Sequence, residues 1–578
     1  MALTPDIQQK INTWLGSDYD AQTQAEIREL QTQNQDDFLS DAFYRNLEFG
    51  TGGLRGIMGA GSNRMNRYTL GMAAQGLSNY LLQQFPGQEI KVAVAHDSRN
   101  NSRAFAQLVS DIFSANGLTV YLFEDLRPTP ELSFTIRHLG CQSGCVITAS
   151  HNPKEYNGFK VYWNDGAQVV APHDQNIIRE VEAIQSVQEV KFQADASRIH
   201  LIGADVDAAY LAKVKELSIN PAAIQRQHDL KIVFTPIHGT GITLVPKALA
   251  QLGFTNVSVV EAQATPDGNF PTVLSPNPEE KVAMQMALDQ AKALDADIVL
   301  ATDPDSDRVG IAVKNMQGEW VLVNGNQTAA LLTYYLLSAR QQAGKMTDRD
   351  FIVYTIVTSE VLGDIARSYG VKSYQTLTGF KYIAGLIREL EGDATYIGGG
   401  EESYGFMIGD FVRDKDAVSA CALLAEMAAV AKDNGRTLYQ EMTQMYAQFG
   451  LYQEHLISLT KKGQRGAEEI QEMMRDLRAT PPATIAGSPV VELRDYKTGI
   501  IKNLRTGLEL PTGLESSNVL QFITEDGSKI SARPSGTEPK IKFYFSVKQP
   551  LKSVVDFDLA SRLANEKIQA IIEDMQLK

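Results

Sequence analysis

Cysteine is scarce in this chain of 578 residues, which has only Cys141, Cys145 and Cys421. Three cysteines are too few for a disulfide framework, and their spacing lacks the paired Cys-x-x-Cys of a zinc site. We interpret them as reduced thiols, mostly in the core, with a Cys141–Cys145 redox switch as the less favoured alternative. The chain also lacks a run of 18 apolar residues and a start typical of a signal peptide. We therefore expect a cytoplasmic protein with no membrane partner.

Positive charge is in deficit, because 54 Lys and Arg residues face 69 Asp and Glu residues and give a net charge of -15. A charge of this sign repels a nucleic-acid backbone, so nucleic acid is not an expected partner. The chain is 43% hydrophobic and carries 21% charged residues of mixed sign, which excludes a disordered or low-complexity protein. Its length predicts about four domains.

Short strand-like runs alternate with helical stretches, and this α/β pattern occurs three times. Residues 5–48, with spaced apolar positions among Gln, Asp and Glu, are typical of an amphipathic helical lead-in. The alternation begins near residue 90, restarts at 230 and appears again at 351. From about 450, the runs PVVELRDY, VLQFIT and IKFYFSV and a helix from about 556 predict a smaller α+β domain. The predicted domains are 1–205, 206–325, 326–450 and 451–578.

Four polar loops follow predicted strands, where open α/β sheets tend to bind their ligands. They lie far apart in the sequence, one in each predicted domain. Our hypothesis is that they converge, so that each domain supplies one wall of a single central cleft.

The first loop, TASHNP at 148–153, places Ser150 beside His151 directly after an apolar strand. A serine on such a turn is a candidate exposed nucleophile. For this loop alone, a plain Asx or Ser turn is the alternative. The Gly-x-Ser-x-Gly elbow of an esterase is absent.

The second loop, DPDSDR at 303–308, has carboxylates at alternate positions, Asp303, Asp305 and Asp307. Carboxylate oxygens are the ligands that Mg²⁺ prefers. A straight strand would hold Asp303 and Asp307 about 13 Å apart, so the loop must curl to bind one ion. An EF-hand fails, because Arg308 and Lys314 stand where that motif needs Gly and Glu. A solvated acidic turn is the alternative, and we favour the metal.

The third loop, GGGEESYG at 398–405, follows the strand TYI. Its glycines allow close backbone approach, and Glu401 and Ser403 match the donors of a polyol such as a sugar. The loop is not a dinucleotide fingerprint, because Ser403 takes the place of the last glycine. A glycine-rich turn with a solvated pair of glutamates is the alternative.

The fourth loop, RPSGTEPK at 533–540, has the properties of a phosphate cradle. Arg533 offers a fork of donors, Ser535 and Thr537 offer hydroxyls, and Gly536 leaves backbone N–H groups for an anion nest. It is not a nucleotide P-loop, and a β-hairpin turn is the alternative.

Two further stretches, GTGGLRG at 50–56 and TGFK at 378–381, each place a cation beside small residues. These cations are Arg55 and Lys381. Whether each lies in a turn or brings charge into the cleft stays open.

TASHNP, DPDSDR, GEESYG and RPSGTEPK, in this order and one per predicted domain, closely resemble the motifs of the α-D-phosphohexomutase superfamily. The resemblance spans about Gly50 to Phe545, and GEESYG with the helical lead-in is most similar to the phosphoglucomutase branch, which includes phosphopentomutases. It implies three related α/β domains and a smaller α+β domain around one cleft. It also implies transfer of a phosphoryl group between glucose 1-phosphate and glucose 6-phosphate through a phosphoserine and glucose 1,6-bisphosphate, with Mg²⁺ as cofactor.

The resemblance further implies a role for each motif residue. Ser150 is implied as the phosphoserine and, with Asp303, Asp305 and Asp307, as a metal ligand. Arg55 and His151 are implied in catalysis with Lys160, which stands in the proton-transfer position and needs a lowered pKa for that role. Substrate binding is implied for Arg308, Thr378, Gly379, Lys381, Glu401, Ser403, Arg533, Ser535, Gly536, Thr537 and Lys540.

One departure bears on the substrate. The phosphomannomutase-like branch has Ser-Gly-His where this chain has Ser403-Tyr404-Gly405, which favours glucose over mannose phosphates and leaves pentose phosphates open. A phosphatase with Asp303 as nucleophile and a non-catalytic phosphosugar-binding protein remain alternatives, although the Ser150 loop together with three carboxylates argues against a pure binder. We expect a monomer, since one chain can close its own site.

Overall fold

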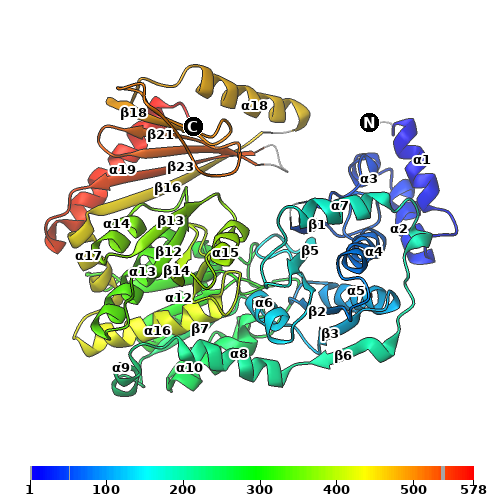
Figure 1. Ribbon diagram of the computed structural model, residues 1–578, viewed down its shortest axis with the longest axis horizontal. Coiled ribbons are helices and arrows are strands. Elements are labelled where there is room, and N and C mark those ends of the chain that lie inside the picture. The colour runs from blue at the N-terminus through cyan, green and yellow to red at the C-terminus, as the bar shows by residue number, and fades with distance from the viewer. Residues whose placement is uncertain (1–2, 51, 462, 536–539, 578) are drawn as a thin grey trace.

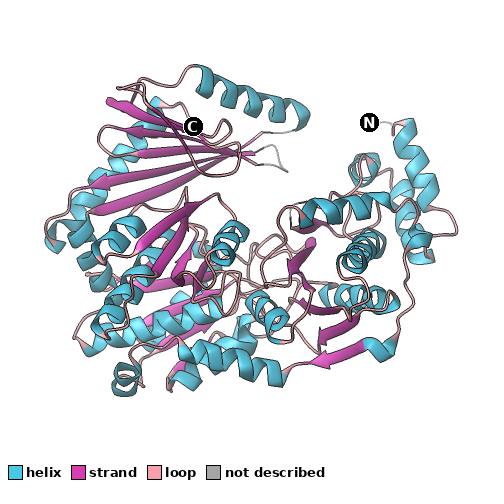
Figure 2. Cartoon of the chain, in the orientation of Figure 1, coloured by secondary structure: helices cyan, strands magenta, loops and turns pink. Residues whose placement is uncertain are grey.

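The computed structural model describes residues 3–50, 52–461, 463–535 and 540–577. They form an N-terminal group of helices, three α/β units and a C-terminal antiparallel sheet with its own helices (Figures 1 and 2). The predicted fold class is therefore confirmed.

The N-terminal helices confirm the predicted helical lead-in. They are α1 (Pro5–Trp14), α2 (Ala21–Thr32) and α3 (Asp36–Phe43). The Asp20 side chain caps α2 by accepting a hydrogen bond from Thr23 N at 2.8 Å. Trp14 packs edge to face against Phe43 and against Tyr68, with ring centroids 5.6 Å apart in both pairs. Because Tyr68 belongs to the first α/β unit, these contacts anchor the lead-in on that unit.

The first α/β unit is a six-stranded sheet in the order β1-β5-β4-β2-β3-β6. Its strands are β1 (Gly53–Ile57), β2 (Lys91–His96), β3 (Thr119–Phe123), β4 (Ser143–Ile147), β5 (Tyr156–Trp163) and β6 (Ile199–Ile202). Its helices are α4 (Arg67–Gln84), α5 (Ser102–Ala115), α6 (Thr129–His138) and α7 (His173–Ala183), followed by the short turns η1 (Val187–Glu189) and η2 (Ala196–Arg198). Strand β5 runs antiparallel to both of its neighbours.

The second unit is a five-stranded sheet in the order β11-β10-β9-β7-β8. Its strands are β7 (Ile232–Thr235), β8 (Val257–Val259), β9 (Ile298–Thr302), β10 (Val309–Lys314) and β11 (Trp320–Val323). Its helices are α8 (Ala204–Glu216), α9 (Pro221–Arg226), α10 (Gly241–Leu252), α11 (Glu261–Ala264) and α12 (Lys281–Leu294).

The third unit is a four-stranded sheet in the order β13-β12-β14-β15. Its strands are β12 (Asp350–Thr355), β13 (Lys372–Thr376), β14 (Thr395–Gly400) and β15 (Phe406–Ile408). Its helices are α13 (Gly325–Gln342), α14 (Val361–Ser368), α15 (Phe380–Glu389), α16 (Ala417–Asp433) and α17 (Leu438–Phe449). The predicted loop at 398–405 is partly wrong, because its three glycines end β14. A Cβ on Gly399 would lie 1.8 Å from the Val353 carbonyl oxygen, so glycine is what allows β14 to pair with β12.

The three α/β units share one plan, which places the first three motif loops at equivalent positions. Residues 148–155 connect β4 to β5, residues 303–308 connect β9 to β10, and residues 401–405 connect β14 to β15. In each case the second strand runs antiparallel to the first. Each motif loop is therefore held at both ends by one ladder of backbone hydrogen bonds.

The C-terminal sheet is antiparallel, in the order β16-β23-β22-β21-β18-β19-β20, with β17 paired to β18. Its strands are β16 (Leu451–Thr460), β17 (Thr484–Ile485), β18 (Ser488–Asp495), β19 (Ile500–Asn503), β20 (Glu509–Pro511), β21 (Leu520–Thr524), β22 (Lys529–Pro534) and β23 (Lys540–Gln549). Its helices are α18 (Gly463–Ala479), the short turn η3 (Val554–Asp556) and α19 (Phe557–Asp574). The α+β pattern predicted from about residue 450 is confirmed.

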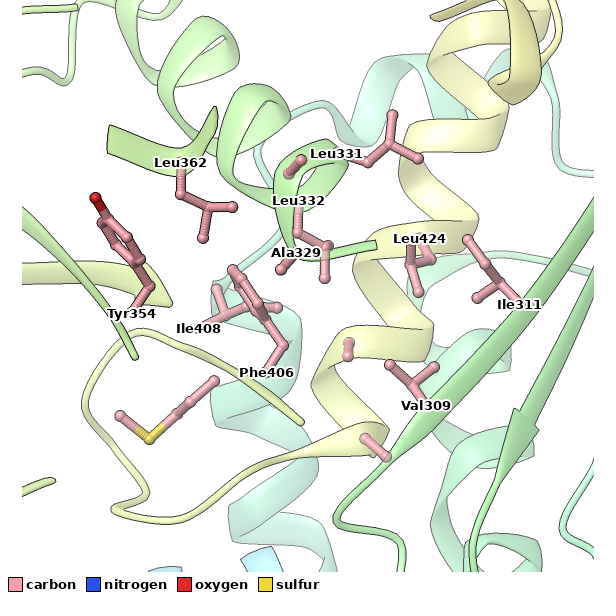
Figure 3. Packing of buried hydrophobic residues seen from close by; sticks show 14 of the residues in the cluster. Val309, Ile311, Ala329, Leu331, Leu332, Tyr354, Leu362, Phe406, Ile408 and Leu424 are labelled. Carbon is pink, nitrogen blue, oxygen red and sulfur yellow. The ribbon is translucent and has the colours of Figure 1, made fainter. Parts of the chain in front are cut away.

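Apolar packing is continuous between the second and third units. Val309 and Ile311 of β10 lie against Leu424 of α16, next to Leu332 of α13 and Phe406 of β15 (Figure 3). Helix α16 belongs in sequence to the third unit but packs against α10 of the second, so burial of this apolar surface fixes the two units together.

All three cysteines are buried and free, which confirms their interpretation as core thiols. Burial raises the pKa of Cys141 to about 12 and raises the pKa of Cys145 further. Thiols held in this form are poor nucleophiles, which disfavours the redox alternative.

Candidate active site

Ser150 stands in a left-handed turn directly after β4, with φ of +51°. Such a backbone costs a non-glycine residue about 1 kcal/mol. Two hydrogen bonds hold it there: Ser150 N donates to Thr148 Oγ1 at 2.8 Å, and Arg99 Nη2 donates to the Ser150 carbonyl oxygen at 2.6 Å. Ser150 lines a cavity but is only 4% exposed, so the prediction of an exposed nucleophile is wrong. Loops from other units cover it, which the local sequence cannot show.

The Ser150 hydroxyl joins the first unit to the second. Its Oγ donates to Asp303 Oδ2 at 2.7 Å and lies 3.2 Å from His151 Nδ1. Burial, reinforced by the cations Arg308 and Arg55, lowers the pKa of His151 well below its usual range. The ring is therefore neutral near pH 7 and has one nitrogen able to accept a proton.

Asp303, Asp305 and Asp307 form a compact cluster, as the curled loop predicted. One oxygen of each carboxylate lies within 4.8 Å of the others, and all three residues are buried. The curl is held by Asp303 Oδ1, which accepts hydrogen bonds from Asp307 N at 3.1 Å and Arg308 N at 3.0 Å. Ser306 turns the chain with φ of +55°.

This carboxylate cluster fits a divalent cation. Within the described part of the chain, Asp305 Oδ1 and Asp307 Oδ1 are buried and accept no hydrogen bond. Buried oxygens of this kind normally have a partner, and hard carboxylate oxygens suit Mg²⁺. Burial and the two neighbouring carboxylates raise the pKa of Asp303 well above its usual range, which is the repulsion that a cation would relieve.

Lys160 on β5 reaches the same cluster. Its Nζ lies 2.8 Å from Asp305 Oδ2 and 3.2 Å from Asp307 Oδ2. Because of these contacts, the prediction that the pKa of Lys160 is lowered is wrong. Burial alone would lower the pKa of Lys160, but Asp305 and Asp307 outweigh it and the pKa is raised.

Lys415 is a second buried cation at the cluster, and the sequence motifs did not reveal it. Its Nζ lies 3.2 Å from Asp307 Oδ2 and 3.1 Å from Asp414 Oδ1. Lys415 occupies space that only glycine leaves open, because a Cβ on Gly405 would lie 2.0 Å from Lys415 Cδ. Asp416 caps α16 at Val418 N, so the sequence signals the start of this helix but not the direction of Lys415.

The predicted cations Arg55 and Arg308 both line the cavity. Arg55 Nη1 donates to Asn152 Oδ1 at 3.3 Å, which ties β1 to the serine loop, residues 148–155 between β4 and β5. Arg308 Nη1 pairs with Glu279. Burial would lower the pKa of Arg308, but Glu279 and Asp307 raise it, so its charge is secure.

Glu401 links the two predicted sugar-contacting stretches. It is 6% exposed and accepts a hydrogen bond from Gly379 N at 2.9 Å. Glu401 lines the cavity, whereas Thr378, Gly379, Lys381 and Ser403 do not. The Lys381 ammonium lies over the Tyr382 ring, 5.2 Å from its centroid, and burial lowers the pKa of Lys381.

One cavity of about 280 Å³ joins the first three motif loops. The residues that line it are Gly50, Gly52, Gly53, Leu54, Arg55, Ser150, His151, Phe159, Lys160, Gln168, Asp307, Arg308, Glu401 and Lys415. These residues come from all three α/β units, so the predicted convergence is confirmed for three of the four loops.

The fourth loop lies in the hairpin between β22 and β23. Arg533 faces Lys542 across the ladder, and Ser535 N donates to the Lys540 carbonyl oxygen at 2.7 Å. Gly536 and Thr537 lie outside the described residues. Among the described residues, none beyond 450 lines the cavity. The contribution of this loop to the cleft stays a prediction.

Charge nevertheless connects the fourth loop to the third. Burial and the neighbouring Glu401 raise the pKa of Glu402 to about 7, while Lys542 and Arg533 act in the opposite direction. The cations of the hairpin thus face the carboxylates that follow β14.

Family models match three successive parts of the chain. They describe phosphoglucomutase/phosphomannomutase alpha/beta/alpha domains I, II and III, at residues 46–188, 208–318 and 324–449. A phosphoglucomutase of Staphylococcus aureus strain N315 is 37% identical over 545 residues, covering 94% of this chain and 96% of the relative. A phosphoglucomutase of Staphylococcus haemolyticus is 36% identical, covering 88% and 92%.

Two solved structures share the fold. A putative phosphomannomutase from Thermus thermophilus has a TM-score of 0.65 and 22% identity, covering 92% of this chain and 98% of its own. The open form of pp63/parafusin, a phosphoglucomutase from Paramecium, has a TM-score of 0.67 and 18% identity, covering 91% and 96%. No helix in the described ranges has the length and apolar character needed to cross a membrane.

Proposed function

This chain belongs to the phosphoglucomutase/phosphomannomutase family, and on that premise we propose that it interconverts glucose 1-phosphate and glucose 6-phosphate. It is an isomerase of the phosphohexomutase type. One observation carries the proposal. Ser150 Oγ lies 2.7 Å from Asp303 Oδ2, in a cavity whose lining also includes Arg308, Lys160 and Glu401.

In the proposed reaction Ser150 carries the phosphoryl group. A sugar hydroxyl oxygen attacks phosphorus, a new O–P bond to the sugar forms, and the bond from phosphorus to Ser150 Oγ breaks with its electron pair left on Oγ. The proton of the sugar hydroxyl balances that charge and ends on Oγ. The product is glucose 1,6-bisphosphate. This intermediate reverses its orientation in the cleft and returns its other phosphoryl group to Ser150 by the same chemistry.

The residues of the cavity supply charge and position for this transfer. A phosphoserine carries about -1.5 to -2 charges at neutral pH, and Arg55, Arg308 and Lys415 bring cations to it. Lys160 is the proposed proton carrier, because it lines the cavity and pairs with Asp305, in the same cluster as the Asp303 carboxylate that accepts the Ser150 hydroxyl. Asp305 and Asp307 raise its pKa, so the role requires that a cation at these carboxylates offset their charge and lower the pKa again. The neutral His151 ring adds a hydrogen bond at Oγ.

Mg²⁺ is the proposed cofactor, held by Ser150, Asp303, Asp305 and Asp307. When bound, it supplies a Lewis acid that neutralises charge on the transferred group. The two buried oxygens that accept no hydrogen bond within the described chain, on Asp305 and Asp307, support this assignment.

We propose that the remaining motif residues bind the sugar and the phosphate that is not being transferred. Glu401, Ser403 and the stretch at 378–381, with Lys381, are proposed to bind the sugar. The hairpin residues Arg533, Ser535, Gly536, Thr537 and Lys540 are proposed to hold the phosphate that is not being transferred. We also retain the domain boundaries at 205, 325 and 450, and a cytoplasmic monomer with a small sugar phosphate as its only partner, as proposals.

A time course of phosphorus NMR with glucose 1-phosphate, Mg²⁺ and a trace of glucose 1,6-bisphosphate tests the reaction. We expect glucose 6-phosphate to appear with the wild-type chain and with Ser110→Ala, which changes a buried serine of α5 that does not line the cavity. We expect none with Ser150→Ala. Inorganic phosphate that depends on Asp303 but not on Ser150 would identify a phosphatase instead. Conversion of mannose or ribose phosphate in preference to glucose phosphate would move the chain to the alternative mutases of the family.

A further inference from the structure

Arg99 lies between β2 and α5, is 3% exposed, and does not line the cavity. It belongs to the stretch HDSR at 96–99, which matches none of the four motifs. Its guanidinium nevertheless donates hydrogen bonds to several carbonyls of the serine loop.

Four backbone carbonyls accept hydrogen bonds from this one guanidinium, three in the serine loop and one on Tyr156, the first residue of β5. Nη1 donates to the carbonyl oxygens of Pro153 at 2.9 Å and Tyr156 at 3.1 Å. Nη2 donates to those of Ser150, at 2.6 Å, and Asn152. The bonds span the whole connection from β4 to β5 and include the carbonyl of the left-handed residue Ser150.

Asp97 and Phe270 hold Arg99 itself in place. Its Nε lies 3.5 Å from Asp97 Oδ2, and its backbone N–H donates to Asp97 Oδ1 at 2.9 Å. The guanidinium lies over the ring of Phe270, 5.1 Å from its centroid. Phe270 comes from the second unit, where a Cβ on the nearby Gly268 would lie 2.2 Å from Asn100 N. The second unit thus packs tightly on the segment that carries Arg99.

We propose that Arg99 is a positioning residue for Ser150. The planar guanidinium fixes the carbonyls around the left-handed turn, and Phe270 sets this assembly against the unit that carries Asp303. Ser150 Oγ is therefore held within hydrogen-bonding distance of Asp303 in the carboxylate cluster. This proposal rests on the proposed function, because it takes Ser150 as the phosphorylated residue.

Single-turnover transfer from the phosphorylated enzyme to a sugar phosphate tests the proposal. The enzyme is first treated with glucose 1,6-bisphosphate, and phosphate on Ser150 is measured by mass spectrometry. Arg99→Lys keeps the positive charge, but a single ammonium group cannot donate to the four carbonyl oxygens that the planar guanidinium reaches. We expect its transfer rate constant to fall about 100-fold relative to the wild type, which is the effect of a misplacement of about 1 Å. Its KM in steady-state turnover should stay within about 3-fold of the wild-type value, because Arg99 does not line the cavity.

Arg64→Lys is the matched control, since Arg64 is 2% exposed and its guanidinium also donates to backbone carbonyls, those of Asp41 and Asn63. We expect its rate constant to equal that of the wild type. Loss of folded protein lowers the amplitude of the single turnover, whereas misplacement of Ser150 lowers the rate constant. If Arg99→Lys is recovered only unfolded, Phe270→Leu provides the measurement, with an expected slowing of about 5-fold.

A wild-type rate constant in Arg99→Lys, or in Phe270→Leu where that variant is needed, would overturn the positioning role and leave Arg99 a structural residue. Absence of phosphate from Ser150 in the wild-type chain would overturn both this proposal and the proposed function. The wild-type sample therefore separates the two failures.

Discussion

Glu454 on β16 is a buried carboxylate between the third unit and the C-terminal sheet, and it makes their junction sensitive to pH. Burial raises its pKa from 4.5 to about 7. The Ser359 hydroxyl, Lys529 of β22 and the Ser546 hydroxyl of β23 act in the opposite direction but do not overcome burial. Tyr446 of α17 also faces it, and that group is neutral at these pH values.

The magnitude follows from the two pKa values. Because the folded state holds the proton more tightly, stability falls as the pH rises from the unfolded pKa through the folded one. Relative to a fully protonated Glu454, the cost is about 1 kcal/mol at pH 5 and about 3 kcal/mol at pH 8. The difference is roughly 70-fold in the equilibrium that opens this junction.

Hydrogen exchange of the amides of β16 measures that opening directly. After correction for intrinsic exchange, we expect protection in the wild type to fall about 70-fold more between pH 5 and pH 8 than in Glu454→Gln, which mimics the protonated acid. Glu472→Gln, at an exposed position on α18, should behave like the wild type. Equal pH dependence in Glu454→Gln and the wild type would refute the reasoning.

Two further predictions concern contacts around the carboxylate cluster. Thr129→Val removes the hydrogen bond from Thr129 Oγ1 to Asp305 Oδ2, at 3.0 Å, and should raise the half-saturating Mg²⁺ concentration about 10-fold; unchanged Mn²⁺ binding by electron paramagnetic resonance would contradict this. Gly405→Ala would place a Cβ 2.0 Å from Lys415 Cδ and should lower kcat about 100-fold, whereas Gly385→Ala, whose Cβ meets open space, should leave kcat unchanged; a thermal-shift scan checks that both variants fold.

The parts of the site that could be predicted from the sequence are those set by short, local patterns. DPDSDR places three carboxylates within five residues, so a curl that brings them together follows from the reach of the chain, and the structure has that curl. The loop TASHNP likewise identified Ser150 from its place after a strand. The helical lead-in and the change of pattern near 450 were readable because hydrophobic periodicity is local.

The exposure of Ser150 and the charge around Lys160 could not be predicted in this way. Ser150 was expected to be exposed, yet Asp303, 153 residues away in the sequence, accepts a hydrogen bond from it. Lys160 was expected to have a lowered pKa, yet Asp305 and Asp307 come from another unit and reverse the shift. Both errors have one cause, because the electrostatic surroundings of a side chain depend on which units meet at it.

The residues that place the motif loops against their neighbours carry no chemical motif of their own. Within the second unit, a Cβ on Gly239 would lie 2.5 Å from Pro304 Cα, and Thr240 N donates to the Pro304 carbonyl oxygen at 2.8 Å, so the loop after β7 packs directly on the carboxylate loop. Between the first and second units, Gly268 allows the same close approach to Asn100, beside Arg99. A glycine in the sequence does not indicate which segment will pack against it. Chemistry is therefore concentrated in a few recognisable loops, while their mutual placement depends on small residues that are visible only once the units are packed.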